Sequence, residues 1–190
     1  MRNSHRPNPL AGAAAGAIGG LLGSWLMVRF NHLVGPNGAT EEDRRRSHMH
    51  HRSEAQPNEW DGTIADEPGS RQAASRVAEG VIGRPLSESE KDVGGPIAHY
   101  LFGAAAGALY GAMAEVKPET AAGFGAPFGA TVWMTADEIG MPLLGFSDPP
   151  TELPMSRHAS ALGTHLVFGL TVEATRRMFR GSPRQSRQRL

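Results

Sequence analysis

The sequence predicts an all-α protein: a polytopic transmembrane bundle of four spanning helices, with a long, partly disordered polar loop after the first span. Three observations predict it. Most charged residues lie in two stretches, 29–92 and 176–190. The remaining sequence contains apolar stretches of about twenty residues, the length that crosses a bilayer as a helix. Those stretches are rich in glycine and alanine, and small residues are typical of packed membrane helices.

The composition also excludes some classes of protein. The 190 residues suit a single domain. Nineteen basic and nineteen acidic residues give no net charge, whereas nucleic-acid-binding proteins normally carry a basic excess. A mean hydropathy of −0.33 hides the segregation of polar and apolar stretches. The chain has no cysteine, so disulfides and thiolate metal sites are excluded.

Residues 1–28 form the N-terminal flank and the first span. Residues 10–28 are uncharged and rise roughly 28 Å as a helix, close to the hydrocarbon thickness of about 30 Å. This is long for a signal peptide, and no cleavage site follows, so we expect the helix to be retained. Trp25 suits the membrane interface, and Arg29 is expected to close the helix.

Residues 29–93 read as a polar, partly disordered loop that is broken by several prolines. A short helix is expected at 70–82, where Ala73, Ala74, Val77 and Val81 recur at helical spacing. This helix either lies on the membrane surface or is an ordinary loop helix. His48, His50 and His51 suggest a metal-binding tract, but without cysteine in a flexible loop this signal is weak.

Residues 94–180 predict a three-helix membrane region. The second span covers 96–114, with Pro96 in its first turn. The third covers 121–144 and is expected to be kinked at Pro127. The fourth covers about 156–174, and residues 181–190 form a basic, disordered tail. The arginines near the C-terminus, together with Arg2 and Arg6, place both termini in the cytoplasm by the positive-inside rule.

Glycines recur four residues apart in three of the predicted spans. Residues four apart share one helix face, where glycines let two backbones approach closely. We expect these faces to pack against each other within one bundle; the alternative is a glycine-zipper homo-oligomer. The residues concerned are Gly12, Gly16, Gly20, Gly103, Gly107, Gly111, Gly125 and Gly129.

Ionisable residues at membrane depth are costly and are therefore candidates for function. The predicted topology brings five of them to the outer end of the bundle: His99, Asp137, Glu138, His158 and His165. The simplest interpretation is a polar cap that fixes the packing of the helices. The alternatives are a proton or small-ion pathway and, less favoured, a divalent metal site. At the other end, Glu115 and Glu173 are expected to form interfacial ion pairs with Lys117, Arg176 and Arg177.

The second half of the chain contains a series of spaced motifs: His99-Tyr100-x-x-Gly103, Gly107-x-x-Tyr110-Gly111, Gly125-x-x-x-Gly129-x-x-x-Trp133, Glu138-x-x-x-Pro142, His165-x-x-x-Gly169 and Glu173-x-x-Arg176-Arg177. Together these motifs resemble the YagU-like family of bacterial inner-membrane proteins. The resemblance covers roughly residues 95–180 and implies a small inner-membrane protein with about four spans. It implies no catalytic residue, and the long polar loop departs from the family pattern.

No nucleotide-binding, metalloprotease or serine-hydrolase motif is present. We therefore expect no enzyme, no cofactor and no resident metal. The leading interpretation is an integral inner-membrane protein with a structural or homeostatic role, whose main partner is the lipid bilayer. The alternatives are a proton or small-ion transporter and a soluble helical interaction protein. The first span speaks against the soluble alternative, because it is apolar on every face.

Overall fold

The structure is a computed structural model that describes residues 7–34, 69–147, 149–153 and 155–180. Within these ranges the chain is helical and contains no strand. The long helices are α1 (Pro9–Val34), α4 (Glu88–Val116) and α7 (Met155–Arg180). A further column is continuous from 126 to 143 and comprises α5 (Ala126–Val132), a π-helical segment η4 (Trp133–Gly140) and α6 (Met141–Leu143). The all-helical fold class is confirmed for these residues.

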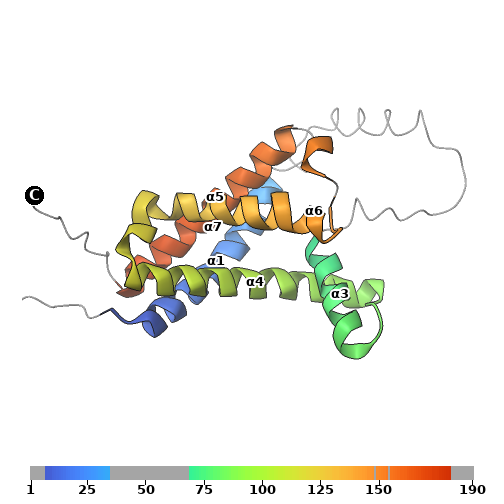
Figure 1. The fold of residues 1–190 in the computed structure, drawn as a ribbon, viewed down its shortest axis with the longest axis horizontal. Coiled ribbons are helices and arrows are strands. Elements are labelled where there is room, and N and C mark those ends of the chain that lie inside the picture. Colours follow the sequence, from blue (N-terminus) through green and yellow to red (C-terminus); the bar gives the residue numbers. More distant parts are fainter. Residues whose placement is uncertain (1–6, 35–68, 148, 154, 181–190) are drawn as a thin grey trace, which may run out of the picture.

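The helices form a bundle in which α1 packs against both α4 and α7, and α7 packs against α5 (Figure 1). α4 is joined to α5 by the short irregular helix η3 (Pro118–Gly125). α3 (Gly69–Ile82) packs on the beginning of α4, and η5 (Pro150–Glu152) precedes α7. The start of α1 and the end of α7 lie at the same end of the bundle (Figure 1).

Glycines form the contact between α1 and α4. A Cβ atom added at Gly16 would lie 2.0 Å from the carbonyl oxygen of Gly107, and one added at Gly107 would lie 2.2 Å from that of Gly16. Gly12 faces Gly111 and Gly20 faces Gly103 in the same way. The pairing runs in opposite directions along the two helices, so α1 and α4 are antiparallel, and no side chain fits between their backbones.

Close contacts at glycines also hold α5 against α7. A Cβ atom at Gly129 would lie 2.1 Å from the carbonyl oxygen of His165, and one at Gly125 would lie 2.2 Å from that of Gly169. On its other face, α1 meets α7 through Gly19 and Gly23. All eight glycines of the predicted packing faces therefore contact helices of the same chain.

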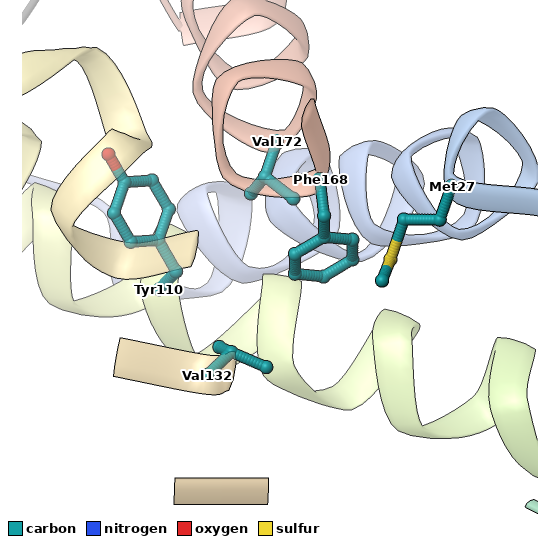
Figure 2. Packing of buried hydrophobic residues seen from close by; sticks show 5 residues of the cluster. All are labelled: Met27, Tyr110, Val132, Phe168 and Val172. Carbon is teal, nitrogen blue, oxygen red and sulfur yellow. The ribbon is translucent and has the colours of Figure 1, made fainter. Parts of the chain in front are cut away.

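The interior contains few large apolar side chains. Its buried hydrophobic cluster consists of Met27, Tyr110, Val132, Phe168 and Val172. Figure 2 shows that these residues come from all four packed segments, with Phe168 between Met27 and Val132. The largest side chains with less than 2% exposure include a glutamate, an arginine and a serine. Many large apolar side chains are instead exposed on the outside of the bundle.

Several predicted helix boundaries are wrong. α1 does not end at Arg29 but continues to Val34, with the Arg29 guanidinium 5.5 Å from the centre of the Trp25 ring. α4 begins at Glu88 and not at Pro96, which lies inside the helix. The backbone N–H of Ser87 donates to the Glu90 carboxylate at 2.8 Å, and this cap starts the helix before the apolar stretch begins.

The third predicted span also begins in the wrong place. Gly123, Phe124 and Gly125 have positive φ angles and interrupt the helix. Pro127 therefore lies in the first turn of α5 and does not kink a longer helix. The cause is local, since a left-handed backbone at Gly123 and Gly125 suits glycine, and proline is well placed in a first helical turn. The fourth predicted span is extended in both directions by α7.

The predicted helix at 70–82 is present as α3. The rest of the predicted polar loop is divided: 88–93 belongs to α4, whereas residues 35–68, which include the histidine tract, lie outside the described residues. The same holds for the predicted basic tail, 181–190.

Candidate functional site

The five ionisable residues predicted to gather at one end of the bundle fall into an outer pair and an inner group. In the outer pair, Nδ1 of His158 lies 2.7 Å from Oε1 of Glu138, and Nε2 lies 3.0 Å from the carbonyl oxygen of Pro150. An ionised carboxylate and a carbonyl both accept hydrogen bonds, so both ring nitrogens of His158 must donate. The geometry therefore fits an imidazolium paired with a carboxylate.

The inner group contains His165, Asp137 and His99. Nδ1 of His165 lies 3.0 Å from the carbonyl oxygen of Ala161, one turn earlier on α7. That nitrogen must carry the hydrogen, because a carbonyl can only accept. Oδ2 of Asp137 lies 3.6 Å from the same nitrogen, which is an electrostatic contact and too long for a good hydrogen bond. The His99 ring interacts electrostatically with both His165 and Asp137.

Ser24 belongs to this inner group as well, although no motif in the sequence singles it out. Its side chain is 1% exposed and occupies the space beside Gly103, where an added Cβ would lie 2.0 Å from Oγ. The ring of His99 lies beside the backbone of Ser24. Among the described residues, neither Ser24 Oγ nor His99 Nε2 has a hydrogen-bond partner, and buried polar atoms without a partner are rare.

The inner group thus collects one polar side chain from each packed segment: Ser24 of α1, His99 of α4, Asp137 of η4 and His165 of α7. The carboxylate comes from the π-helical segment, and such segments recur at functional sites. Chemically, the group offers two imidazoles, a carboxylate and a hydroxyl, which can bind and exchange protons. In the described parts of the chain, no three histidine or acidic side chains lie close enough to hold a metal ion.

The opposite end of the bundle carries a buried network of glutamates and arginines. Glu173 is fully buried and Arg176 is 1% exposed. Nε of Arg176 donates to Oε2 of Glu173 at 2.7 Å, and its Nη2 donates to Oε1 at 2.9 Å. The Tyr110 hydroxyl donates to Oε2 at 3.0 Å, and Arg177 donates to Oε1. Four charge-assisted hydrogen bonds thus converge on Glu173; the one from Tyr110 links α4 to α7, and the other three lie within α7.

Glu115 extends the network to both ends of the described chain. Nε and Nη2 of Arg180 donate to its two carboxylate oxygens at 3.1 and 3.0 Å. The backbone N–H of Asn8 donates to the same carboxylate at 3.2 Å. The guanidinium of Arg177 also lies 4.3 Å from the centre of the Phe124 ring, a cation–π distance.

The sequence predicted interfacial ion pairs at this end, and the partners Glu115, Glu173, Arg176 and Arg177 do meet there. The prediction missed that Glu173 and Arg176 are buried, and it missed Tyr110 and Arg180. Lys117 forms no ion pair within the residues described. The spacing of Glu173, Arg176 and Arg177 on one helix face could have signalled the pairing.

Residues 84–174 match a family model described as a protein of unknown function, DUF1440. The matched region contains α4, η3, the α5–α6 column and most of α7. It includes all five ionisable residues of the predicted cluster, together with Tyr110, Glu115, Phe124 and Glu173 of the network at the opposite end. Ser24, Asn8, Arg176, Arg177 and Arg180 lie outside it. No curated protein matches the chain. No solved structure matches it either.

Proposed function

We propose that this chain is an integral membrane protein with four spans, which serves a structural or homeostatic role in a bacterial inner membrane. The proposed spans are α1, α4, the α5–α6 column and α7. The location follows from the resemblance to YagU-like proteins, and the match to a domain of unknown function is compatible with an uncharacterised family. No enzymatic activity, cofactor or nucleic-acid partner forms part of the proposal.

The distribution of side chains carries this proposal. Small and polar residues fill the contacts between helices, whereas large apolar side chains point outward. In α1, Ile18, Leu21, Leu22 and Trp25 are each more than 40% exposed, and Leu101 and Leu109 in α4 are more than 60% exposed. Such continuous apolar surface is unfavourable in water but is the expected surface of a bundle in lipid, where small residues drive helix packing.

Helix length supports the same proposal. α1 and α4 are long and apolar enough to cross a membrane. By themselves two such helices are weak support, because a signal sequence or a soluble core helix can pass the same test. In this bundle, however, both helices pack against partners through glycines and keep an outward apolar face. α7 packs directly on α1, and α5 packs on α7, which supports including both α7 and the α5–α6 column among the proposed spans.

The arrangement of the ends fits four spans. Asn8, just before α1, and Arg180, at the end of α7, both bond to Glu115. The start of the first helix and the end of the last helix therefore lie on the same side of the bundle. An even number of spans requires this. The basic residues near both termini favour the cytoplasmic side.

Membrane insertion and topology are tested together. Expressed cells are fractionated, and the membranes are washed at alkaline pH; the protein should remain in the pellet and require detergent for extraction. Because the natural chain has no cysteine, single cysteines at Gly80 and Lys117 can be labelled from outside intact cells. Labelling at position 80 and protection at 117 are expected. A protein that stays monodisperse in buffer without detergent would refute the proposal.

A second candidate function is a pathway for protons or small ions, and the inner group of polar residues favours it. Asp137 lies 3.6 Å from His165, and buried His99 Nε2 and Ser24 Oγ lack partners among the described residues. Proton flux would be measured in liposomes with a pH-sensitive dye. Asp137→Asn and His165→Ala should abolish the flux, whereas Thr171→Val, on the same helix, should not. Flux that survives both substitutions, or no flux in the unsubstituted protein, would leave the inner group with a packing role alone.

A further inference from the structure

α3 is fixed across the beginning of α4 by close packing and ion pairs. A Cβ atom at Gly95 would lie 2.5 Å from Cγ of Arg71, and one at Gly94 would lie 3.3 Å from Cβ of Ala74. Nη2 of Arg71 donates to Glu88 at 3.0 Å, and Nη1 pairs with Asp92 at 2.5 Å. The Ser75 hydroxyl accepts the backbone N–H of Leu86 at 3.1 Å. α3 is therefore not a loose loop helix.

The direction of α3 differs from that of the bundle. In Figure 1, α3 (green) crosses the end of α4 steeply and extends beyond it. If α4 spans a bilayer, α3 lies along the bilayer surface. The position along α4 at which α3 crosses it agrees with this orientation. Residues 96–114 of α4 rise roughly 28 Å, which matches a hydrocarbon core of about 30 Å, and α3 crosses at Gly94 and Gly95, immediately outside that stretch.

One side of α3 is apolar and has no partner among the described residues. Val77 is 67% exposed and Val81 is 78% exposed, and the two lie four residues apart on one helix face. On α4, the exposed residues Val93, Ile97 and Leu101 form a similar stripe, which leads from the crossing point along the proposed lipid-facing surface. Arg76 and Glu79 pair with each other on a different side of α3.

From this geometry we infer that α3 is an interfacial anchor, whose Val77–Val81 face inserts into the boundary between lipid head groups and acyl chains. An amphipathic helix held at this depth and parallel to the surface is the arrangement in which such a face is covered by lipid. Residues 35–68 are a poorer match as a cover, because they contain only Met49, Trp60 and Ile64 as large apolar residues. The inference rests on the proposed membrane location.

Spin labels measure this directly, because the chain has no native cysteine. Single cysteines would be introduced as Val81→Cys on the proposed lipid face, and as Arg76→Cys and Glu79→Cys on the polar side, where the two native side chains pair with each other. The full-length variants would be reconstituted in liposomes of bacterial lipids. Collision rates of each label with oxygen, which partitions into lipid, and with a water-soluble nickel chelate would then be compared.

We expect the ratio of oxygen to nickel collisions to be severalfold higher at position 81 than at positions 76 and 79. Equal ratios, with high nickel access at all three, would place the Val77–Val81 face in water and overturn the inference. Low access to both reagents at position 81 would mean that protein covers this face, either residues 35–68 or a second copy, and would overturn it too.

A label at Leu109, which lies inside the 96–114 stretch of α4 and is 63% exposed, tests the membrane location separately from the anchor. High oxygen access at position 109 combined with high nickel access at 81 would leave the membrane protein intact and remove the anchor alone. High nickel access at position 109 would instead contradict the membrane location itself.

Discussion

The buried pair of Glu173 and Arg176 makes the sharpest prediction about stability. The substitution Glu173→Gln keeps the size of the side chain and one carbonyl oxygen to accept hydrogen bonds, but it removes the negative charge. Arg176 would then be a cation with 1% exposure, whose remaining acidic neighbour is Glu115, at 3.7 Å from Nη1. The variant thus tests whether the network is shielded from water, as the burial of Glu173 and Arg176 indicates.

The size of the effect follows from burial. Removing one partner of a buried ion pair typically costs about 3–5 kcal/mol, because the other charge is left uncompensated. Exposed pairs are worth less than about 1 kcal/mol. The exposed pair Arg76–Glu79, with side chains 69% and 50% exposed, is the matched control, so Glu79→Gln should lower the free energy of unfolding by well under 1 kcal/mol.

A double substitution separates charge burial from general damage. In the Glu173→Gln background, Arg176→Met removes the stranded cation and replaces it with an apolar side chain of similar length. Because most of the cost comes from an uncompensated buried charge, removing the Arg176 cation should recover most of the lost stability. Reversible unfolding in mixed micelles with increasing dodecyl sulfate, followed by tryptophan fluorescence, measures all four proteins.

Two results would refute this reasoning. If Glu173→Gln costs no more than the Glu79→Gln control, the pair is hydrated or absent in the membrane. If the double variant is less stable than Glu173→Gln alone, the loss does not come from a stranded charge, and Arg176 must stabilise the bundle through contacts other than those with Glu173.

Three further substitutions test the glycine contact between α1 and α4, the buried Tyr110 hydroxyl and the cap at the start of α4. Gly107→Leu should lower the free energy of unfolding by at least about 2 kcal/mol, because its Cβ would lie 2.2 Å from the Gly16 carbonyl oxygen. If the variant instead keeps its stability but changes its apparent size on detergent gels, the glycine faces pack between chains and not within one chain. Tyr110→Phe keeps the ring stacked 4.4 Å from that of Phe128 but removes the hydroxyl that donates to the buried Glu173 carboxylate. The free energy of unfolding should fall by about 1.5–3 kcal/mol in the same assay. A change near zero would mean that the hydroxyl bonds to another group. Glu90→Ala removes the acceptor for the Ser87 N–H and should speed hydrogen exchange in the first turn of α4 while leaving its middle unchanged; unaltered exchange would contradict the cap.

The sequence predicts some parts of this fold well because the signal is local. The first and second spans were recognisable from 19-residue stretches that lack charge. Their ends were not, because hydropathy treats the polar residues 88–93 as loop, whereas hydrogen bonds decide where a helix begins. Ser87 and Glu90 carry the capping-box spacing, and reading that signal would have placed the start of α4 correctly.

The candidate sites were predictable only in part. His165 and Asp137 could be brought together by topology alone, because the directions and lengths of the helices determine which residues lie at the same height along the bundle. Ser24 and Tyr110 could not, because α1 and α4 are apolar on most sides and their sequences do not show which face meets a neighbour. The burial of Glu173 likewise depends on Tyr110, which lies 63 residues earlier in the chain.

The position of α1 between α4 and α7 also constrains how the protein is made. α1 leaves the ribosome first, but Gly16 meets Gly107 and Gly23 meets Phe168, both far downstream. At about 5–20 residues per second of synthesis, the second partner follows on the order of ten seconds later. During that interval the glycine faces of α1 have no partner helix from the same chain, so the α1–α4 and α1–α7 contacts form only after most of the chain has been made.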